Sequence, residues 1–102
     1  MTEPKLERYD VTDFLRGEED VVAYLNAAFD DGHPEVIAHA IGNVARMRGM
    51  SRIAKECGLG RESLYKSLSD RGNPELGTIL RVLKAVGIRL RAEPAADATP
   101  TE

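Results

Sequence analysis

The sequence contains one cysteine, no tryptophan and no long run of apolar residues. A single cysteine excludes a disulfide bond within the chain, and Cys57 stands beside Gly58 in a predicted turn, so we expect it to be a buried, unreactive side chain. No apolar run approaches the roughly 18 residues that a membrane-spanning helix needs, and the polar N-terminus lacks the apolar core of a signal peptide. These absences predict a cytoplasmic protein that does not enter the membrane.

The chain also lacks the residue groupings that metal binding or catalysis requires. His33 and His39 are six residues apart, which places them on different faces of a helix, and Cys57 is distant from both. There is no glycine-rich phosphate loop, and no serine or cysteine has an evident general base and orienting acid. We therefore expect no metal, no cofactor and no enzymatic activity.

The length of 102 residues indicates one domain with a modest helical core. Such a core gives the domain only a small stability, so we expect that association into a homodimer would stabilise it further. We expect residues 1–8 to be a flexible N-terminus, residues 9–92 to be the folded domain, and residues 93–102, which are rich in Ala, Pro, Thr and acids, to be a disordered tail.

The charges are divided unevenly along the chain. Residues 46–91 carry eleven Lys and Arg against four Asp and Glu, whereas residues 1–45 carry three basic residues against ten acidic ones. The net charge of −3 hides this division. A local basic surface is what attracts nucleic acid and releases counterions, whatever the overall charge. The acidic half calls for a separate explanation.

Helix start and stop signals predict two helices in the acidic half. An acidic turn at residues 18–20 precedes the first helix, which stops near Gly32. Its apolar residues lie at helical spacing: Val21, Val22, Leu25, Ala28 and Phe29. Pro34 is well placed to begin the second helix, whose broad apolar face runs from Val36 to Ala45 and which ends before Gly49.

The last helix is expected to begin at Asn73, Pro74 and Glu75, which supply a cap, a proline and an acid, and to end at Gly87. Its expected buried stripe consists of Leu76, Ile79, Leu80, Leu83 and Val86. Residues 88–92 then alternate apolar and basic, which predicts a short strand. A lone strand does not persist, so it would pair with residues 9–11, with a second copy or with a partner protein.

Residues 50–69 have the spacing of two short helices that cross at a sharp turn, which is a helix-turn-helix. Ser51 is expected to cap the first helix, and the small Ala54 lets the second helix pass close over it. Gly58 permits the turn, and Leu64 and Leu68 form an apolar stripe under the second helix. A helix that is apolar below and rich in Arg, Lys, Ser and Tyr above suits the DNA major groove.

The DNA-contacting residues follow from this pattern. Arg61 would hold O6 and N7 of a guanine and Glu62 would accept from cytosine N4, unless both are simply the solvated start of a helix. Ser63, Tyr65 and Lys66 would reach bases or phosphates, with Lys66 the best phosphate contact, although Tyr65 could instead pack. The remaining candidates lie at helix starts, where the DNA backbone is clamped: Arg52 and Asn73. For Asn73, an ordinary helix cap is an equally good interpretation.

Two levels of family resemblance rest on these residues. Residues 48–90 resemble the phage-repressor-like (Xre-type) helix-turn-helix family. Residues 9–94 are similar to one branch of it, the small HigA-like antitoxins called probable addiction-module antidote proteins, partners of RelE/HigB-type toxins. The similarity rests on Tyr9-Asp10, Phe14-Leu15, residues 24–28, 41–51, 60–69, Gly72-Asn73-Pro74 and residues 83–88. One departure is Ser67, where the broad family buries an aliphatic residue that this chain shifts to Leu68. The departure leaves open which of Ser63, Ser67 and Lys66 points into the groove.

The resemblance implies an all-α, lambda-repressor-like domain with an N-terminal helical extension and a short C-terminal strand. It also implies an antitoxin that neutralises an mRNA-cleaving toxin by direct contact and represses its own operon. The acidic half would face the basic toxin through Glu18 and Glu19, with Phe14, Leu15 and Tyr24 as apolar anchors. Those three side chains could instead belong to the chain's own core. The alternative function is a stand-alone transcriptional repressor without a toxin, and a third is a protein-interaction module that no longer binds DNA.

Overall fold

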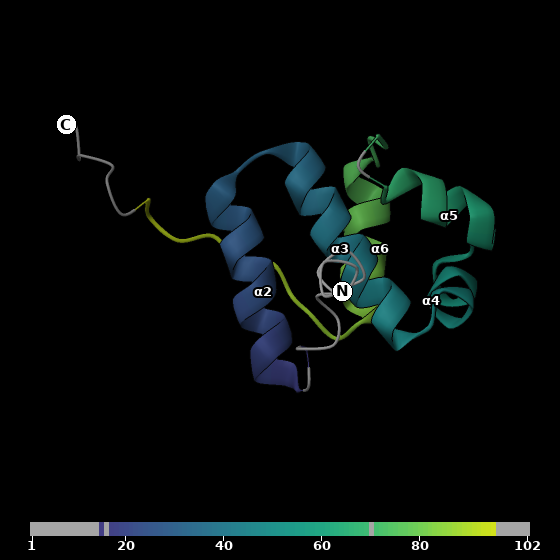
Figure 1. The fold of residues 1–102 in the computed structure, drawn as a ribbon, viewed down its shortest axis with the longest axis horizontal. Coiled ribbons are helices and arrows are strands. Elements are labelled where there is room, and N and C mark those ends of the chain that lie inside the picture. Colours follow the sequence, from purple (N-terminus) through teal and green to yellow (C-terminus); the bar gives the residue numbers. More distant parts are fainter. Residues whose placement is uncertain (1–14, 16, 70, 96–102) are drawn as a thin grey trace, which may run out of the picture.

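The computed structural model describes residue 15 and residues 17–69 and 71–95. This part of the chain forms five helices, as predicted, and contains no strand. The helices are α2 (Glu18–Asp31), α3 (Pro34–Arg48), α4 (Met50–Cys57), α5 (Arg61–Ser67) and α6 (Leu76–Ala85). Figure 1 shows α2 at one side of the molecule and α5 at the other, with α3 between them.

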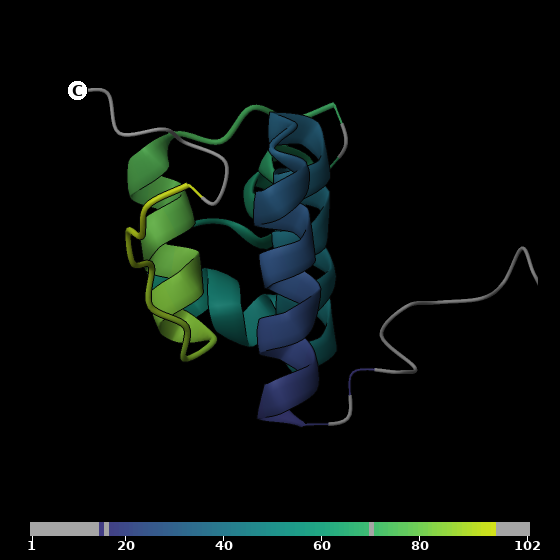
Figure 2. The same cartoon turned by 90° about the vertical axis from the view of Figure 1, so that its left-hand side faces the viewer.

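Helices α2 and α3 form an antiparallel pair joined by a tight turn. Gly32 ends α2 in the left-handed conformation, with φ of 82°, and its N–H donates to the carbonyl of Ala28. Pro34 then starts α3, where its missing N–H is harmless. Both helix bounds agree with the prediction from the sequence. The two helices lie side by side in both views (Figures 1 and 2).

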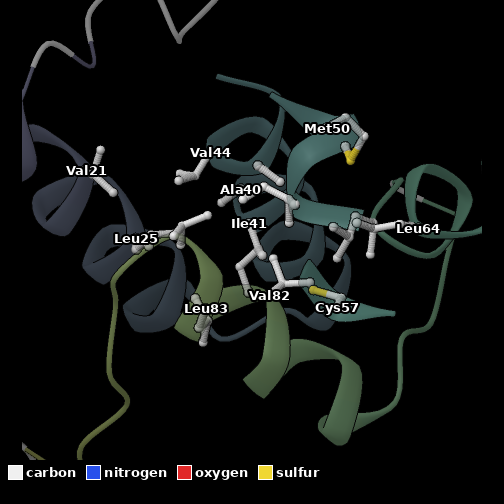
Figure 3. Close-up of a cluster of buried hydrophobic side chains, with 14 of the residues drawn as sticks. Val21, Leu25, Ala40, Ile41, Val44, Met50, Cys57, Leu64, Val82 and Leu83 are labelled. Carbon is white, nitrogen blue, oxygen red and sulfur yellow. The ribbon is translucent and has the colours of Figure 1, made fainter. Parts of the chain in front are cut away.

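The core runs through all five helices. Helix α3 packs on α2, α4 and α6, and α4 packs on α5 and α6. Figure 3 shows Ile41 of α3 between Leu25 of α2 and Leu64 of α5, together with side chains of α4 and α6 in the same cluster. The largest fully buried side chains are Val21, Leu25, Ile41, Val44, Ile53, Leu64, Leu68, Val82 and Leu83. One continuous core therefore fixes the position of α5 relative to α2.

Two glycines allow other backbone segments to touch the C-terminal end of α5. A Cβ on Gly42 of α3 would lie 2.7 Å from the carbonyl oxygen of Leu68. A Cβ on Gly72 would lie 2.2 Å from the carbonyl oxygen of Ser67. Neither approach is possible with a side chain present, so both glycines are needed to hold the end of α5 against the domain.

The predicted strand at residues 88–92 is wrong. The N–H of Ile88 donates to the Leu83 carbonyl at 2.8 Å and so completes the end of α6, after Gly87 has turned the chain with φ of 83°. No strand is present among the described residues to pair with it, and an unpaired strand is not stable. Residues 87–93 instead pass behind α2 in Figure 1 and line an open groove together with Val22 and Phe29.

Two predicted helix caps are also wrong. Helix α4 begins at Met50, so Ser51 lies inside it, because Gly49 ends α3 and precedes α4 with φ of 103°. Helix α6 begins at Leu76 rather than Asn73, since residues 72–75 form an irregular segment and Glu75 is the residue before the helix. Asn73 is therefore not a helix cap.

The expected apolar stripes were partly misassigned. In α6, Leu76 and Leu80 are 67% and 45% exposed, and Val82 is buried in their place. Val22 of α2 and Val36 of α3 are also exposed, at 44% and 41%.

Several predictions fall on residues outside the described part of the chain. These include the flexible N-terminus at residues 1–8, the possible strand partner at residues 9–11, Phe14, and residues 96–102 of the predicted tail. The domain boundaries therefore stay predictions.

Candidate functional site

Helices α4 and α5 are joined by only three residues, Gly58, Leu59 and Gly60. Gly58 adopts the left-handed conformation with φ of 71°, and the N–H of Leu59 donates back to the carbonyl of Ala54 at 2.9 Å. Leu64 of α5 is fully buried, and Leu68, directly after the helix, is 1% exposed. The apolar stripe predicted under the second helix is thus present, and it presses α5 onto the core.

The opposite side of α5 is open to solvent. The predicted DNA-contacting residues of this helix are all exposed: Arg61, Glu62, Ser63, Tyr65 and Lys66. Ser67 is half-buried, so Ser63 and Lys66 are the more accessible of the three residues left open by the sequence. Among the described residues, no carboxylate lies within ion-pair distance of Arg61 or Lys66. Both charges are therefore available to an anionic ligand.

Arg52 and Asn73 lie outside α5. Arg52 of α4 is exposed, but its guanidinium lies 2.9 Å from the carboxylate of Glu56, one helical turn along. An exposed pair of this kind is worth less than about 1 kcal/mol, so it would yield to a phosphate at small cost. Asn73 is exposed in the segment between α5 and α6.

A chain of polar contacts that the sequence did not reveal crosses α3. The side-chain amide of Asn43 donates to the hydroxyl of Tyr24 at 2.8 Å, and its oxygen accepts from the guanidinium of Arg46. That guanidinium also lies over the ring of Tyr65, 5.8 Å from its centroid. Asn43 is only 5% exposed, and a buried amide needs such partners. Its position within the apolar face of α3 was the one available signal.

The predicted partner-contacting residues separate into two groups. Glu18 and Glu19 are exposed in the first turn of α2. Leu15 is 9% exposed and belongs to the chain's own core. Tyr24 is half-buried against that core, with its hydroxyl bonded to Asn43. Phe14 lies outside the described residues. Among the described members of this group, only Glu18 and Glu19 are exposed.

An exposed ion pair closes the turn between α2 and α3. The imidazole Nδ1 of His33 lies 2.9 Å from the carboxylate of Asp31, and this hydrogen bond, with the charge of Asp31 and then of Glu35, raises the pKa of His33 above 6.5. The same hydrogen bond lowers the pKa of Asp31 below 3.8. The ion pair between Asp31 and His33 is therefore fully formed at pH values between 3.8 and 6.5. It is lost as pH rises through the raised pKa of His33 or falls through the lowered pKa of Asp31.

The pKa of His33 gives a simple test of this turn. We expect Asp31→Asn to lower the pKa of His33 measured by NMR titration, because both the hydrogen bond and the charge disappear. Glu35→Gln is the matched control, since Glu35 acts only through its charge and should lower the pKa less. An unchanged titration in Asp31→Asn would show that the pair does not form in solution.

Cys57 is buried, as predicted, at 4% exposure. Burial raises the pKa of its thiol, against the opposing effect of Arg81. The thiolate form that would react or bind a metal is therefore disfavoured.

The described residues contain no group of three or more His, Cys, Asp or Glu side chains placed to hold a metal ion. In the same part of the chain, every helix is too short or too polar to span a bilayer.

Comparison with known proteins places the sequence near one family. The family described as "Probable addiction module antidote protein" matches residues 5–94. A protein of Haemophilus influenzae (strain ATCC 51907 / DSM 11121 / KW20 / Rd), named only "Uncharacterized protein", is 41% identical over 93 residues, which cover 91% of this chain and 95% of the relative. No solved structure matches the chain.

Proposed function

Because the chain belongs to the family of probable addiction module antidote proteins, we propose that it is the antitoxin of a type II toxin-antitoxin system. In this proposal it neutralises a RelE/HigB-like mRNA-cleaving toxin by direct binding and represses its own operon by sequence-specific DNA binding. Family membership supports a toxin partner in general. The kind of toxin rests on the family resemblance described in the sequence analysis, and the proposed DNA-binding activity rests on the basic residues and exposed side chains of α4 and α5.

The observation that carries the proposal is the spatial separation of the two charge clusters. The acidic turn with Glu18 and Glu19 belongs to α2, and the basic residues Arg61 and Lys66 belong to α5. The two helices lie on opposite sides of α3 (Figure 1). A molecule of this kind can bind a cationic protein with one side and DNA with the other, because the two charged surfaces are too far apart to neutralise each other.

The proposed DNA surface treats α4 and α5 as a helix-turn-helix, with α5 in the major groove. Arg61 and Glu62, at the start of α5, would read base edges, and Ser63 and Tyr65 would contact bases or phosphates. The phosphate contacts would come from Lys66, Arg52 and Asn73. The exposure of these side chains supports these roles. The exposed ion pair between Arg52 and Glu56 is weak, so it does not prevent Arg52 from binding a phosphate.

The proposed toxin surface is the acidic side of α2. An enzyme that cleaves mRNA must attract a phosphate backbone and is therefore basic around its active site. Glu18 and Glu19 would speed its association and compete with RNA. Leu15 and Tyr24 pack in the chain's own core, and Phe14, which lies outside the described residues, stays a predicted apolar anchor.

A homodimer completes the proposal. An operator is read by two copies of a helix-turn-helix, with half-site centres about one helical turn, roughly 34 Å, apart. Leu76 and Leu80, the two most exposed large aliphatic side chains of the described residues, provide apolar surface that a second copy would cover.

The DNA-binding part is tested by two single substitutions. We expect Lys66→Ala to weaken binding to all duplexes about equally and to reduce the salt dependence by about one phosphate contact. Arg61→Ala should weaken the binding free energy by roughly 1–3 kcal/mol through one base position and relax the sequence specificity at that position. The measurement is fluorescence anisotropy over a range of salt, with DNA from upstream of the gene and a scrambled duplex.

Arg89→Ala is a suitable control, because this exposed arginine lies in the segment beside α2, away from α5. Its removal should change neither the salt dependence nor the specificity. Wild-type binding that is independent of salt, or an Arg61 and Lys66 double variant that binds like wild type, would reject the proposed DNA surface.

A further inference from the structure

Arg46 is held beside the exposed side of α5 by contacts on two sides. Its guanidinium donates to the buried side-chain oxygen of Asn43 and lies over the ring of Tyr65. Asn43 is in turn fixed by its hydrogen bond to Tyr24. A long basic side chain usually samples many rotamers, and contacts of this kind remove most of that freedom before any ligand arrives.

The charge of Arg46 is nevertheless available. Its side chain is exposed, and among the described residues no carboxylate lies within ion-pair distance of it. Asn43 and Tyr65 are both neutral partners. The guanidinium has five N–H donors, so one bond to Asn43 leaves most of them for an anion.

The position of Arg46 relative to α5 decides which anion it would meet. Tyr65 and Arg61 are four residues apart and so lie on the same side of α5, and Arg46 approaches that side from α3. A residue that flanks a helix inserted in the major groove faces the groove wall, which is made of phosphates, rather than the base edges on its floor.

We propose that Arg46 is a further DNA-contacting residue, which binds a backbone phosphate beside the groove occupied by α5 and is held in place for this by Asn43 and Tyr65. The inference rests on the proposed DNA-binding function and adds a residue from outside the helix-turn-helix. Tyr24 acts as a positioning residue, because its hydroxyl orients Asn43 from the far side of α3.

The test compares Arg46→Gln with wild type in anisotropy titrations over a range of salt, on the DNA from directly upstream of the gene. We expect a five- to tenfold loss of affinity, about equal on a scrambled duplex, and a fall of about 0.9 in the slope of log K against log salt. Arg89→Gln, which removes the same charge beside α2, should leave the slope unchanged.

The Tyr24→Phe variant distinguishes the proposed positioning role of Tyr24 from the direct phosphate contact of Arg46. Loss of the hydroxyl frees Asn43, so affinity should fall two- to threefold while the salt slope stays at the wild-type value. Thermal melts of each variant confirm that the fold is intact. An Arg46→Gln slope equal to wild type overturns this inference alone if Lys66→Ala still lowers the slope. A wild-type chain that binds no duplex overturns both this inference and the proposed DNA-binding function.

Discussion

Gly42→Ala should destabilise the protein by about 1–3 kcal/mol, although alanine is the better helix former. The new Cβ would lie 2.7 Å from the Leu68 carbonyl oxygen and 3.1 Å from the Leu68 Cβ. A backbone carbonyl cannot rotate away, so the end of α5 must shift from α3. For a domain of this size a loss of 1 kcal/mol lowers Tm by about 4–8 °C. DNA affinity should fall as well, because α5 carries the proposed contacts.

Gly77→Ala is the matched control for this prediction. Gly77 lies in α6, and a Cβ there would meet nothing within 4 Å. Alanine should therefore stabilise the protein by about 0.4–1 kcal/mol through the lower entropy of the unfolded chain. Urea titrations followed by circular dichroism measure both variants. Equal stability of Gly42→Ala and Gly77→Ala would show that α3 and α5 are not in contact as described.

Reversing the charges of the acidic turn of α2 should slow toxin binding. With Glu18→Lys and Glu19→Lys combined, we expect association with the basic partner to slow by about ten- to a hundredfold at low salt, because electrostatic attraction becomes repulsion. DNA affinity should not decrease, since α2 and α5 lie on opposite sides of α3. Stopped-flow mixing with the purified partner at several salt concentrations measures the rate.

A matched reversal on the basic half controls for net charge. Glu56→Lys combined with Glu75→Lys changes the total charge by the same amount, and both residues are exposed away from α2. Loss of the exposed pair between Glu56 and Arg52 costs little stability. Toxin association should stay near the wild-type rate. If both double variants slow association equally, net charge rather than the α2 surface governs it.

The features predicted well from the sequence are those set by local signals. Gly32 and Pro34 bound their helices because left-handed backbone and a missing N–H are properties of single residues. The pattern around Gly58 predicted the α4–α5 pair and its buried Leu64 for the same reason. The exposure of Arg61 and Lys66 then follows from the burial of the opposite side of α5.

The features missed depend on contacts between distant residues. Ser51 is a good cap by composition, but Gly49 already turns the chain between α3 and α4, so the helix starts earlier. Periodicity placed Leu76 and Leu80 in the core, although no neighbouring helix covers them. The link from Tyr24 through Asn43 to Arg46 joins residues up to 22 positions apart and has no sequence signature.

Co-expression with the product of the adjacent gene tests the antitoxin function most directly. We expect this gene to encode a basic protein of roughly 100 residues that arrests growth when it is expressed alone. We also expect that this chain restores growth and is recovered in complex with that protein, and that the Glu18→Lys and Glu19→Lys variant restores growth poorly. Equal growth arrest with and without the chain, or failure to recover a complex, would contradict the antitoxin function and leave the stand-alone repressor as the better account.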